Sequence, residues 1–555
     1  MLALKGLASE PRRLTFKGQI LKSASVIALV TLISRICGYL RDQRVALLLG
    51  TSPAADAFIL AFRIPNLIRR MTGEGALGAS FIPVFTGHLR DKPWEATVSF
   101  VQKTFWNLAL VLGVLAVLGS IFSKQVVLIF TLFGATHIQW NLAILLNRVI
   151  FPCVLFIGLA ALVSAVLYSF HIFALPSSTS IFFNLALILC SFGFVYRPIL
   201  RWVPESFRTT AIALAVGVLV GSALQLLVQL PTLLKKGMRL KPEVTFRDPD
   251  VRKVGKLMLP AFFGMGVYQI NFFVDTIFAT SSRMPTGSIT SLYIADRVMQ
   301  LVLGTYAIAV STALLPLLSH QVAAGEFAEM KRAFGFSIRI VSFITIPAAV
   351  GLILLRGPII QVLFQHGHFT AGSTLLTANA LLYYSLGLPA FAAIKLITPA
   401  FYSTQDTTTP ARIGAYALGA NIALNTVFLL LLCRYLSNGG PALASSLAAY
   451  FNFALLFFVF RGRFGKLDVP GFLASFAKIA VSTLVMAGVS YECLRLSNFE
   501  SFGHFVSQAG LLVLLIVVPV GVYFAAAWVL RCEELGEFLL LLRRRERGDP
   551  AVAGF

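Results

Sequence analysis

Long apolar runs separated by short polar connections dominate the chain. From about Ala24 almost to the C-terminus, stretches such as LVLGVLAVLGSIF and LLVLLIVVPVGVYFAAAWVL recur, and their apolar positions do not alternate with polar ones. A helix needs about 20 such residues to cross the hydrocarbon core of a bilayer. Because lipid offers backbone groups no hydrogen-bond partners, the pattern predicts membrane-spanning helices.

The pattern predicts about 14 transmembrane helices and therefore an all-α polytopic membrane protein. The expected spans lie near 24–50, 54–88, 98–122, 140–172, 177–196, 209–234, 254–281, 287–320, 330–355, 374–403, 409–434, 440–461, 470–494 and 505–530. Composition excludes a water-soluble globule, since 57% of the 555 residues are hydrophobic, 12% are charged and the mean hydropathy is +0.83. The six cysteines are scattered singly, which disfavours a disulfide framework or a zinc site.

Charge predicts the orientation of the spans. The formal net charge is +23, and the most basic connection, KKGMRLKPEVTFRDPDVRKVGK, follows the sixth span. Counting Lys and Arg on the connections places both termini in the cytoplasm. Residues 1–22 resemble the charged start of a signal peptide, but Arg35 interrupts the apolar run that follows, so we expect a retained first span. A nucleic-acid partner is not expected, because no soluble basic domain is present.

A faint internal repeat divides the chain into two halves. FIPVFTGH at 81–88 recurs as LLPLLSH at 314–320, and LYSFHIFALP at 167–176 recurs as FYSTQDTTTP at 401–410. The repeat predicts two pseudo-symmetric six-helix lobes with a site between them, as in transporters that rock around a central cavity. The expected divisions are an N-lobe at 1–234, a basic cytoplasmic linker at 235–253, a C-lobe at 254–463, and two further helices with a basic tail at 464–555.

Charged residues interrupt the first span in SRICGYLRDQRVALLLG. At 100° per residue Arg35, Gly38 and Asp42 share one stripe of a helix, whereas Arg41 and Arg44 lie elsewhere. A charge at mid-bilayer costs about 2.5–3.5 kcal/mol, which implies pairing or a watery cavity. We therefore expect the helix to break near Gly38, so that all these charges reach one cavity.

The second span repeats the theme. Asp56, Arg63 and Arg70 share a helix face, Arg69 lies on another, and Pro65 is expected to kink the helix. The eighth span adds Asp296 and Arg297. Arginines outnumber acids in these spans, and arginine suits phosphate because its planar fork donates bidentately. Snorkelling at helix ends or structural ion pairing remains the alternative reading of these arginines.

No motif predicts an enzyme. The chain has no GxSxG, HExxH or Walker loop, and the pair His366 and His368 has no carboxylate or cysteine companions for a metal. Three functions remain open: an exporter of a lipid-linked sugar, an exporter of a drug, which would need an anionic cavity if the drug is cationic, and a non-transporting membrane scaffold.

One long segment, residues 34–85, resembles the signature of the MurJ/MviN family, the lipid II flippases of bacterial peptidoglycan synthesis. It reads SRICGYLRDQRVALLLGTSPAADAFILAFRIPNLIRRMTGEGALGASFIPVF. Three later segments resemble further motifs of this family: YIADRVMQLVLG, LFQHGHFTAGST and AFYSTQDTTTPARI. The resemblance implies the fold of the multidrug/oligosaccharidyl-lipid/polysaccharide exporter superfamily, with two extra helices that form a groove for the polyprenyl tail. It also implies the lipid bilayer of the bacterial inner membrane and lipid II as partners, and we expect a monomer.

The resemblance also implies site residues. The family's cavity arginines match Arg41, Arg69 and Arg297, and further positions match Arg35, Asp56 and Glu74. Some members have a sodium site, whose acid matches Asp275 and whose other ligands match Asn421, Asn425 and Ser445. Asn425 stands where an aspartate can sit, and Gln300 where some members carry glutamate. No organic cofactor is expected, and sodium or the membrane potential is the expected driving force.

Overall fold

The computed structural model describes residues 16–71, 77–131, 138–193, 207–305, 307–465, 469–497, 499 and 505–536, and these residues are helical apart from short connections. The N-terminal half forms one bundle. Its helices are α1 (Phe16–Leu49), α2 (Pro53–Met71), α3 (Leu77–Asp91), α4 (Trp94–Ile121), α5 (Ser123–Leu128), α6 (Trp140–Ile150), α7 (Cys153–Ser169), α8 (Ala174–Gly193), α9 (Phe207–Leu227) and α10 (Leu230–Lys235).

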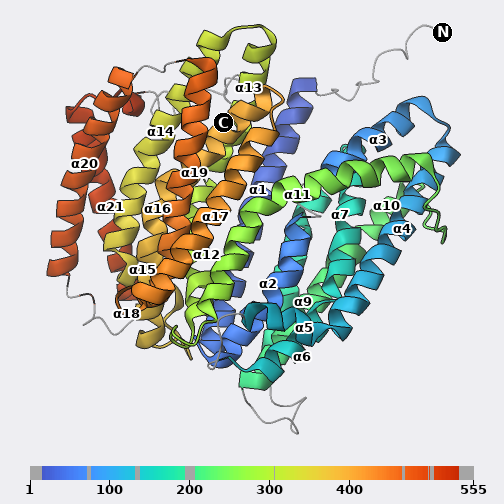
Figure 1. Cartoon of the computed structure of the whole chain (residues 1–555), viewed down its shortest axis with the longest axis horizontal. Helices are drawn as coiled ribbons and strands as arrows, with labels where there is room; N and C mark the ends of the chain where they lie inside the picture. The colour runs from blue at the N-terminus through green and yellow to red at the C-terminus, as the bar shows by residue number, and fades with distance from the viewer. Residues whose placement is uncertain are drawn as a thin grey trace, which may run out of the picture.

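The second half forms another bundle, and two last helices lie beside it (Figure 1). The bundle consists of α11 (Pro249–Ala279), α12 (Ser288–Thr305), α13 (Ala307–Ala323), α14 (Phe327–Leu354), α15 (Arg356–Phe364), α16 (Ala371–Ser403), α17 (Thr408–Leu431), α18 (Cys433–Leu436) and α19 (Gly440–Phe464). The last two helices are α20 (Val469–Leu496) and α21 (Phe505–Val529), which pack on each other and on α14 and α15.

Within the described residues, ten helices are long and apolar enough to cross a membrane. The chain is therefore a multi-pass membrane protein, and the predicted all-α fold is confirmed. Each of the 14 expected spans coincides with a helix or with two consecutive helices, although the count of 14 crossings is not itself established.

The internal repeat is visible in the positions of the helices. α4 and α14 begin at Trp94 and Phe327, 233 positions apart, and α8 and α17 begin at Ala174 and Thr408, 234 positions apart. Between the paired helices the backbone repeats too, because His171 and Gln405 both adopt the left-handed conformation, at φ 57° and 61°. Helices and a turn therefore recur in the two halves at the spacing of the sequence repeat.

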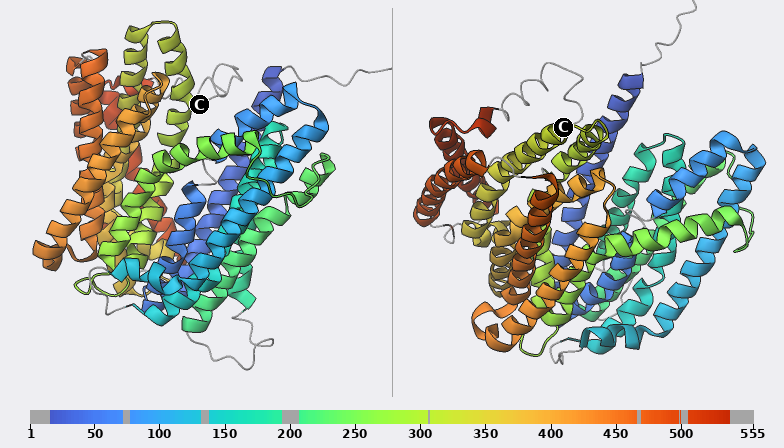
Figure 2. Two further views of the ribbon diagram at one scale, coloured as in Figure 1. Left: turned by 45° about the vertical axis from the view of Figure 1, so that its right-hand side comes forward. Right: turned by 45° about the horizontal axis from the view of Figure 1, so that its top comes forward.

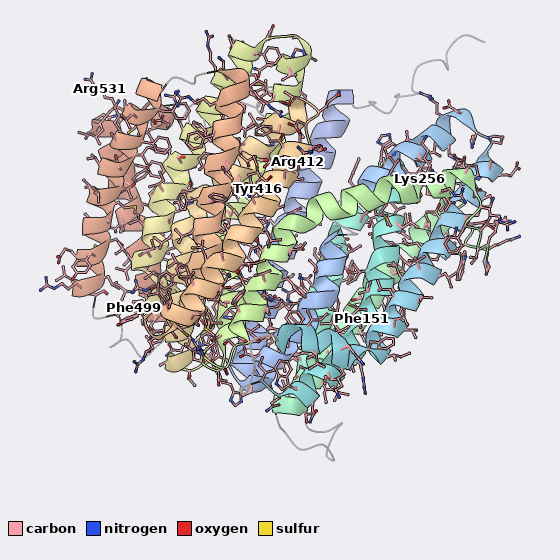
Figure 3. All side chains as sticks on the ribbon, in the orientation of Figure 1. Phe151, Lys256, Arg412, Tyr416, Phe499 and Arg531 are labelled. Carbon is pink, nitrogen blue, oxygen red and sulfur yellow. The ribbon has the colours of Figure 1, made fainter. Side chains whose placement is uncertain are left out.

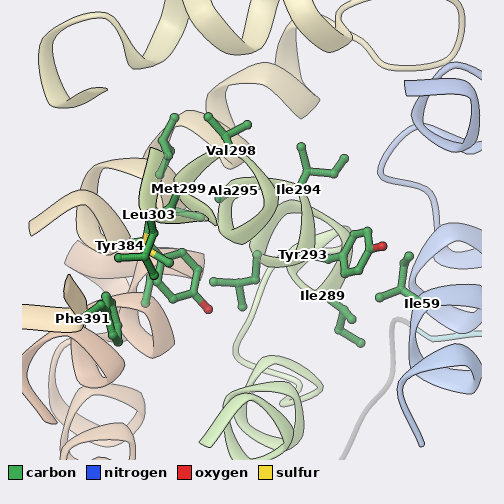
Figure 4. Close-up of a cluster of buried hydrophobic side chains, with 14 of the residues drawn as sticks. Ile59, Ile289, Tyr293, Ile294, Ala295, Val298, Met299, Leu303, Tyr384 and Phe391 are labelled. Carbon is green, nitrogen blue, oxygen red and sulfur yellow. The ribbon is translucent and has the colours of Figure 1, made fainter. Parts of the chain in front are cut away.

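α11 connects the lobes. It packs against α3 and α4 at its start and against α17 and α19 further along, so one continuous helix touches both bundles (Figures 1 and 2). α12 forms the centre of the packed interface: Ile289 and Tyr293 face Ile59 of α2, while Leu303 faces Tyr384 of α16 (Figure 4). Van der Waals packing of such side chains helps to hold the lobes together, because helices in lipid gain little from apolar burial itself.

The lobes touch at the end of the molecule opposite Arg531 (Figures 1 and 3). There the N–H of His368 donates to the carbonyl of Leu47 (2.9 Å). Gly50 has φ +58°, and a Cβ on it would collide with the carbonyl of His368. Glycine is therefore required for the close approach of the lobes. We call this contact region the interlobe gate.

Candidate functional site

A cavity of about 480 Å³ lies between the lobes. Helices α1, α2, α8 and α9 of the N-lobe and α12, α15 and α16 of the C-lobe supply its walls. The charged residues that line it are Arg35, Arg41, Asp42, Arg297 and Lys395. Four cations thus face one acid among the described lining residues.

Arg41 and Asp42 form the N-lobe part of the site. Arg41 donates twice to one oxygen of Asp42, from Nε (3.0 Å) and Nη2 (2.7 Å), and its Nη1 donates to Asn184 Oδ1 (2.9 Å). Asn184 in turn donates to the carbonyl of Ser34 on α1 (3.3 Å). This network fixes the Arg41 guanidinium against α8, at the cavity wall.

Arg297 completes the pair from the other lobe. Its Nε lies 3.6 Å from the second oxygen of Asp42, and its Nη2 donates to the hydroxyl of Tyr293 (3.1 Å). Tyr293 donates to Asp42 (3.2 Å), so one carboxylate holds an arginine from each lobe. Burying a single shared acid between two arginines leaves a net positive site that attracts an anion.

Two further cations extend the positive surface. Arg35 donates from Nη2 to the carbonyl of Gly304 on α12 (2.9 Å), which joins the lobes beside the cavity. Lys395, on α16 between Pro389 and Pro399, also lines the cavity. Lys395 was not among the residues predicted from the sequence, although a lysine inside an apolar span is the same signal that identified the arginines.

The expected break near Gly38 is wrong, because α1 is one uninterrupted helix from Phe16 to Leu49. Arg35, Gly38, Arg41 and Asp42 all reach the cavity from this unbroken helix, since long arginine side chains can reach around the helix surface. Arg44 does not line the cavity; its guanidinium lies 3.9 Å from the centre of the Phe192 ring.

Other residues singled out in the sequence lie in several places. Arg63 donates to the carbonyl of Phe272 on α11 (2.8 Å), and Asp296 accepts from Gln300 beside the cavity (2.5 Å). Pro65 lies inside α2, which continues past it to Met71. The Arg69 side chain and Glu74 lie outside the described residues.

Asp56 is buried at the interlobe gate and does not line the cavity. Its carboxylate accepts hydrogen bonds from the N–H of Gly287 (2.8 Å), the N–H of Thr290 (2.9 Å) and the Thr290 hydroxyl (2.7 Å). Asp56 of one lobe therefore caps the N-terminus of α12 in the other lobe. The positive end of a helix stabilises such an acid.

The four residues matched to a sodium site are in contact. Asp275 on α11 accepts from Asn421 (3.2 Å) and Asn425 (3.1 Å) of α17 at one oxygen, and from Ser445 of α19 (2.5 Å) at the other. All four side chains are buried. No group of three or more His, Cys, Asp or Glu that could hold a metal occurs in the described part of the chain.

α20 and α21 form an apolar groove with the C-lobe. The groove has a volume of about 320 Å³ and lies between α14, α15, α20 and α21. Its lining includes Phe343, Pro347, Leu515 and Tyr523. Val302 of α12 also lines it, while its neighbours Leu301 and Leu303 line the cavity, so the two spaces share the wall made by α12.

Two helical lobes around a cationic cavity, closed at one end by interlobe contacts, define a transporter of the alternating-access class. A family model described as lipid II flippase MurJ matches residues 45–520. The chain is 36% identical over 454 residues to a probable lipid II flippase MurJ of Vibrio cholerae, a match that covers 80% of this chain and 83% of the relative. The chain belongs to the lipid II flippase MurJ family.

Solved structures agree. A structure of lipid II flippase MurJ in an inward closed conformation matches with a TM-score of 0.72 and 26% identity, covering 90% of this chain and 98% of that one. An inward-facing multidrug resistance transporter of the MATE family matches with a TM-score of 0.63, covering 79% of this chain and 98% of that one. At 14% identity, the second likeness shows the fold alone.

Proposed function

We propose that this protein moves lipid II, a disaccharide-pentapeptide linked through pyrophosphate to a polyprenyl chain, from the cytoplasmic to the periplasmic leaflet of the bacterial inner membrane. The observation that carries the proposal is the cavity with four cations and one acid, in a chain of the MurJ family. The anionic pyrophosphate matches this charge, whereas a cationic drug would be repelled by it. No bond in the substrate needs to be broken, so the protein acts as a transporter.

The pyrophosphate is proposed to bind between Arg41 and Arg297. Both guanidinium groups already share Asp42, so they are held at the interface of the lobes before the substrate arrives. Arg35 and Lys395 add charge at other points of the same cavity. Charge-assisted hydrogen bonds to phosphate are roughly twice as strong as neutral ones, and arginine can make two in parallel.

The polyprenyl tail is proposed to lie in the groove beside α20 and α21. Each methylene gains about 0.8 kcal/mol by staying in an apolar medium, so a long tail must not follow the headgroup into the wet cavity. The groove is apolar, and α12 lines both the groove and the cavity, so a headgroup and a tail of one molecule could occupy both.

The interlobe gate is proposed to close the periplasmic end. We place both termini in the cytoplasm, which puts the bonds of Asp56, Leu47 and His368 at the opposite, periplasmic side. Further bonds at the same end join Thr51 Oγ1 to Ser373 Oγ (2.8 Å) and Gln43 to the carbonyl of Leu363 (3.1 Å). Alternating access would break these bonds and form others at the cytoplasmic end. One chain supplies both lobes, so a monomer is sufficient.

Sodium is the proposed coupling ion. Asp275, Asn421, Asn425 and Ser445 offer one carboxylate, two amide oxygens and one hydroxyl, which are the hard ligands that such a cation prefers. Asn425 Oδ1 is buried without a hydrogen-bond partner, and rotation of that amide would turn an oxygen toward Asp275. Bound sodium would supply a positive charge that neutralises Asp275 between α11, α17 and α19.

Complementation tests the function. The full chain should restore growth of a bacterium depleted of its own lipid II flippase, and Arg41→Ala or Arg297→Ala should abolish this while leaving expression and membrane insertion near normal. Lys395→Ala should weaken complementation and Lys395→Arg should retain it. Arg90→Ala is the matched control, because that side chain is exposed and pairs only with Asp91 among the described residues. Full complementation by both cavity variants would refute the assignment of the site.

A further inference from the structure

The segment between α10 and the first turns of α11 presents an unusual surface. It lies on the outer edge of the N-lobe, next to α4, and leads into the part of α11 where Lys256 lies (Figures 1 and 3). We call its outward-facing residues the linker surface. These residues are Arg239, Lys241, Val244, Phe246, Arg247, Arg252 and Lys253, all of which are exposed.

The backbone of this segment is fixed to α4. Asn107 donates to the carbonyl of Thr245 (2.8 Å) and accepts from the N–H of Thr245 (2.9 Å), as a neighbouring strand would. Trp106 Nε1 donates to the carbonyl of Leu240 (3.2 Å). The residues on either side of Thr245, Val244 and Phe246, are both exposed.

The acidic residues of the segment all face the N-lobe. Glu243 and Asp248 lie 3.6 Å and 3.0 Å from Lys103 Nζ of α4. Asp250 lies 2.7 Å from Lys92 Nζ and 3.0 Å from His88 Nε2. The acids of the segment therefore pair with lysines of the N-lobe, so they do not neutralise the cations of the linker surface, which are available to bind an anionic partner.

Two apolar side chains stand among these cations. Val244 is 50% exposed and Phe246 is 53% exposed, although both sit on a segment whose backbone is firmly held. Nearby, Trp94 is 47% exposed and lies against Gly237. Aromatic side chains beside lysine and arginine are typical of the level of lipid headgroups, where the ring meets the apolar boundary and the cations meet phosphate.

We propose that the linker surface is a docking site for anionic phospholipid headgroups of the leaflet that faces the linker. Arg247, Arg252 and Lys253 would hold the phosphates while Phe246 and Val244 insert at the headgroup boundary. The inward pairing of every acid in the segment provides the charge complementarity, and the position at the outer edge of a membrane-spanning bundle makes lipid the partner within reach. The docking would hold the linker, and the start of α11, at the bilayer surface. It requires no particular transported substrate.

The experiment uses the purified full chain in nanodiscs of pure phosphatidylcholine and of equal parts phosphatidylcholine and phosphatidylglycerol. Phosphatidylglycerol should raise the midpoint of thermal unfolding of the wild type, and inorganic phosphate added to phosphatidylcholine discs should not. The triple variant Arg247→Gln, Arg252→Gln, Lys253→Gln should lose this difference. Native mass spectrometry should show its phosphatidylglycerol affinity reduced on the order of a hundredfold, since each cation near an anionic surface contributes about fivefold.

Two sets of controls make the result specific. The triple variant Lys124→Gln, Arg434→Gln, Arg495→Gln removes as many exposed cations outside the linker and should bind phosphatidylglycerol like the wild type. The variant Arg247→Lys, Arg252→Lys keeps the charge and should also retain binding. If the glutamine variant is poorly folded by size-exclusion chromatography, Phe246→Ser alone should still lower the affinity. Equal binding by the linker variants and the wild type, stabilisation by free phosphate, or an equal loss in the control triple variant would each overturn the proposal.

Discussion

Asp56→Ala should loosen the interlobe gate. The Asp56 carboxylate accepts three hydrogen bonds from the first turn of α12, and two of the donors are the backbone N–H groups of Gly287 and Thr290. All three residues are buried. Removal of the carboxylate leaves the donors without this acceptor and removes the cap of a helix that belongs to the other lobe.

The magnitude follows from the kind of bonds lost. Loss of an N-cap costs about 0.5–2 kcal/mol, and each buried donor left without a partner costs about 1–3 kcal/mol. Water that enters the loosened gate would hydrogen-bond to the freed donors and offset part of this free-energy cost. A net loss of about 3 kcal/mol for the closed gate corresponds to a factor of about 100 in the equilibrium between closed and open gates. Asp56→Asn keeps one oxygen acceptor and should lose less.

Disulfide formation across the gate measures the effect. Thr51→Cys with Ser373→Cys should cross-link under mild oxidation, because the native hydroxyl oxygens lie 2.8 Å apart. Variants that carry only Thr51→Cys or only Ser373→Cys show how much cross-linking involves the six native cysteines. Addition of Asp56→Ala should slow the cross-linking strongly. Asp406→Ala is the matched control, since Asp406 caps α17 within one lobe. Unchanged cross-linking together with full complementation by Asp56→Ala would refute the reasoning.

Three further predictions concern other parts of the molecule. Sodium should raise the unfolding midpoint of the purified protein relative to potassium, and Asp275→Asn should abolish the difference; equal midpoints in both salts would exclude the ion site. Truncation after Arg463 removes α20 and α21, so lipid II transport and cross-linking of a polyprenyl photoprobe should be lost if the shortened chain still inserts; undiminished transport would leave these helices as bracing. Burial alone would raise the pKa of Asp406, but hydrogen bonds from Thr409 and Arg463 lower that pKa to about 2. Because this pKa lies below the unfolded value of about 3.9, the ionised carboxylate stabilises the fold above about pH 4, and this stabilisation is lost as the pH falls through about 2. Asp406→Ala should therefore lower the unfolding midpoint more at pH 7 than at pH 2, and an equal lowering at both pH values would contradict this.

The sequence by itself determined the class of protein and the course of the chain. Hydrophobic runs must become helices in lipid, and the expected spans therefore coincide with the observed helices to within a few residues over most of the chain. The family resemblance predicted that Asp275 would lie near Asn421 and Asn425. Both asparagines lie one helical turn apart, which places them on one face of α17 before any tertiary contact is known.

Only the tertiary structure decided which charges share a cavity. Periodicity gave the direction in which each side chain leaves its own helix, and on that basis α1 was expected to break near Gly38. No break is needed, because the arginine side chain is long enough to reach the cavity from an unbroken helix. There it donates a hydrogen bond to Asn184 of α8. The same limit applies to Asp56 and Lys395. One caps a helix 231 residues away along the chain and the other enters the cavity from α16, and such contacts depend on how the two lobes pack.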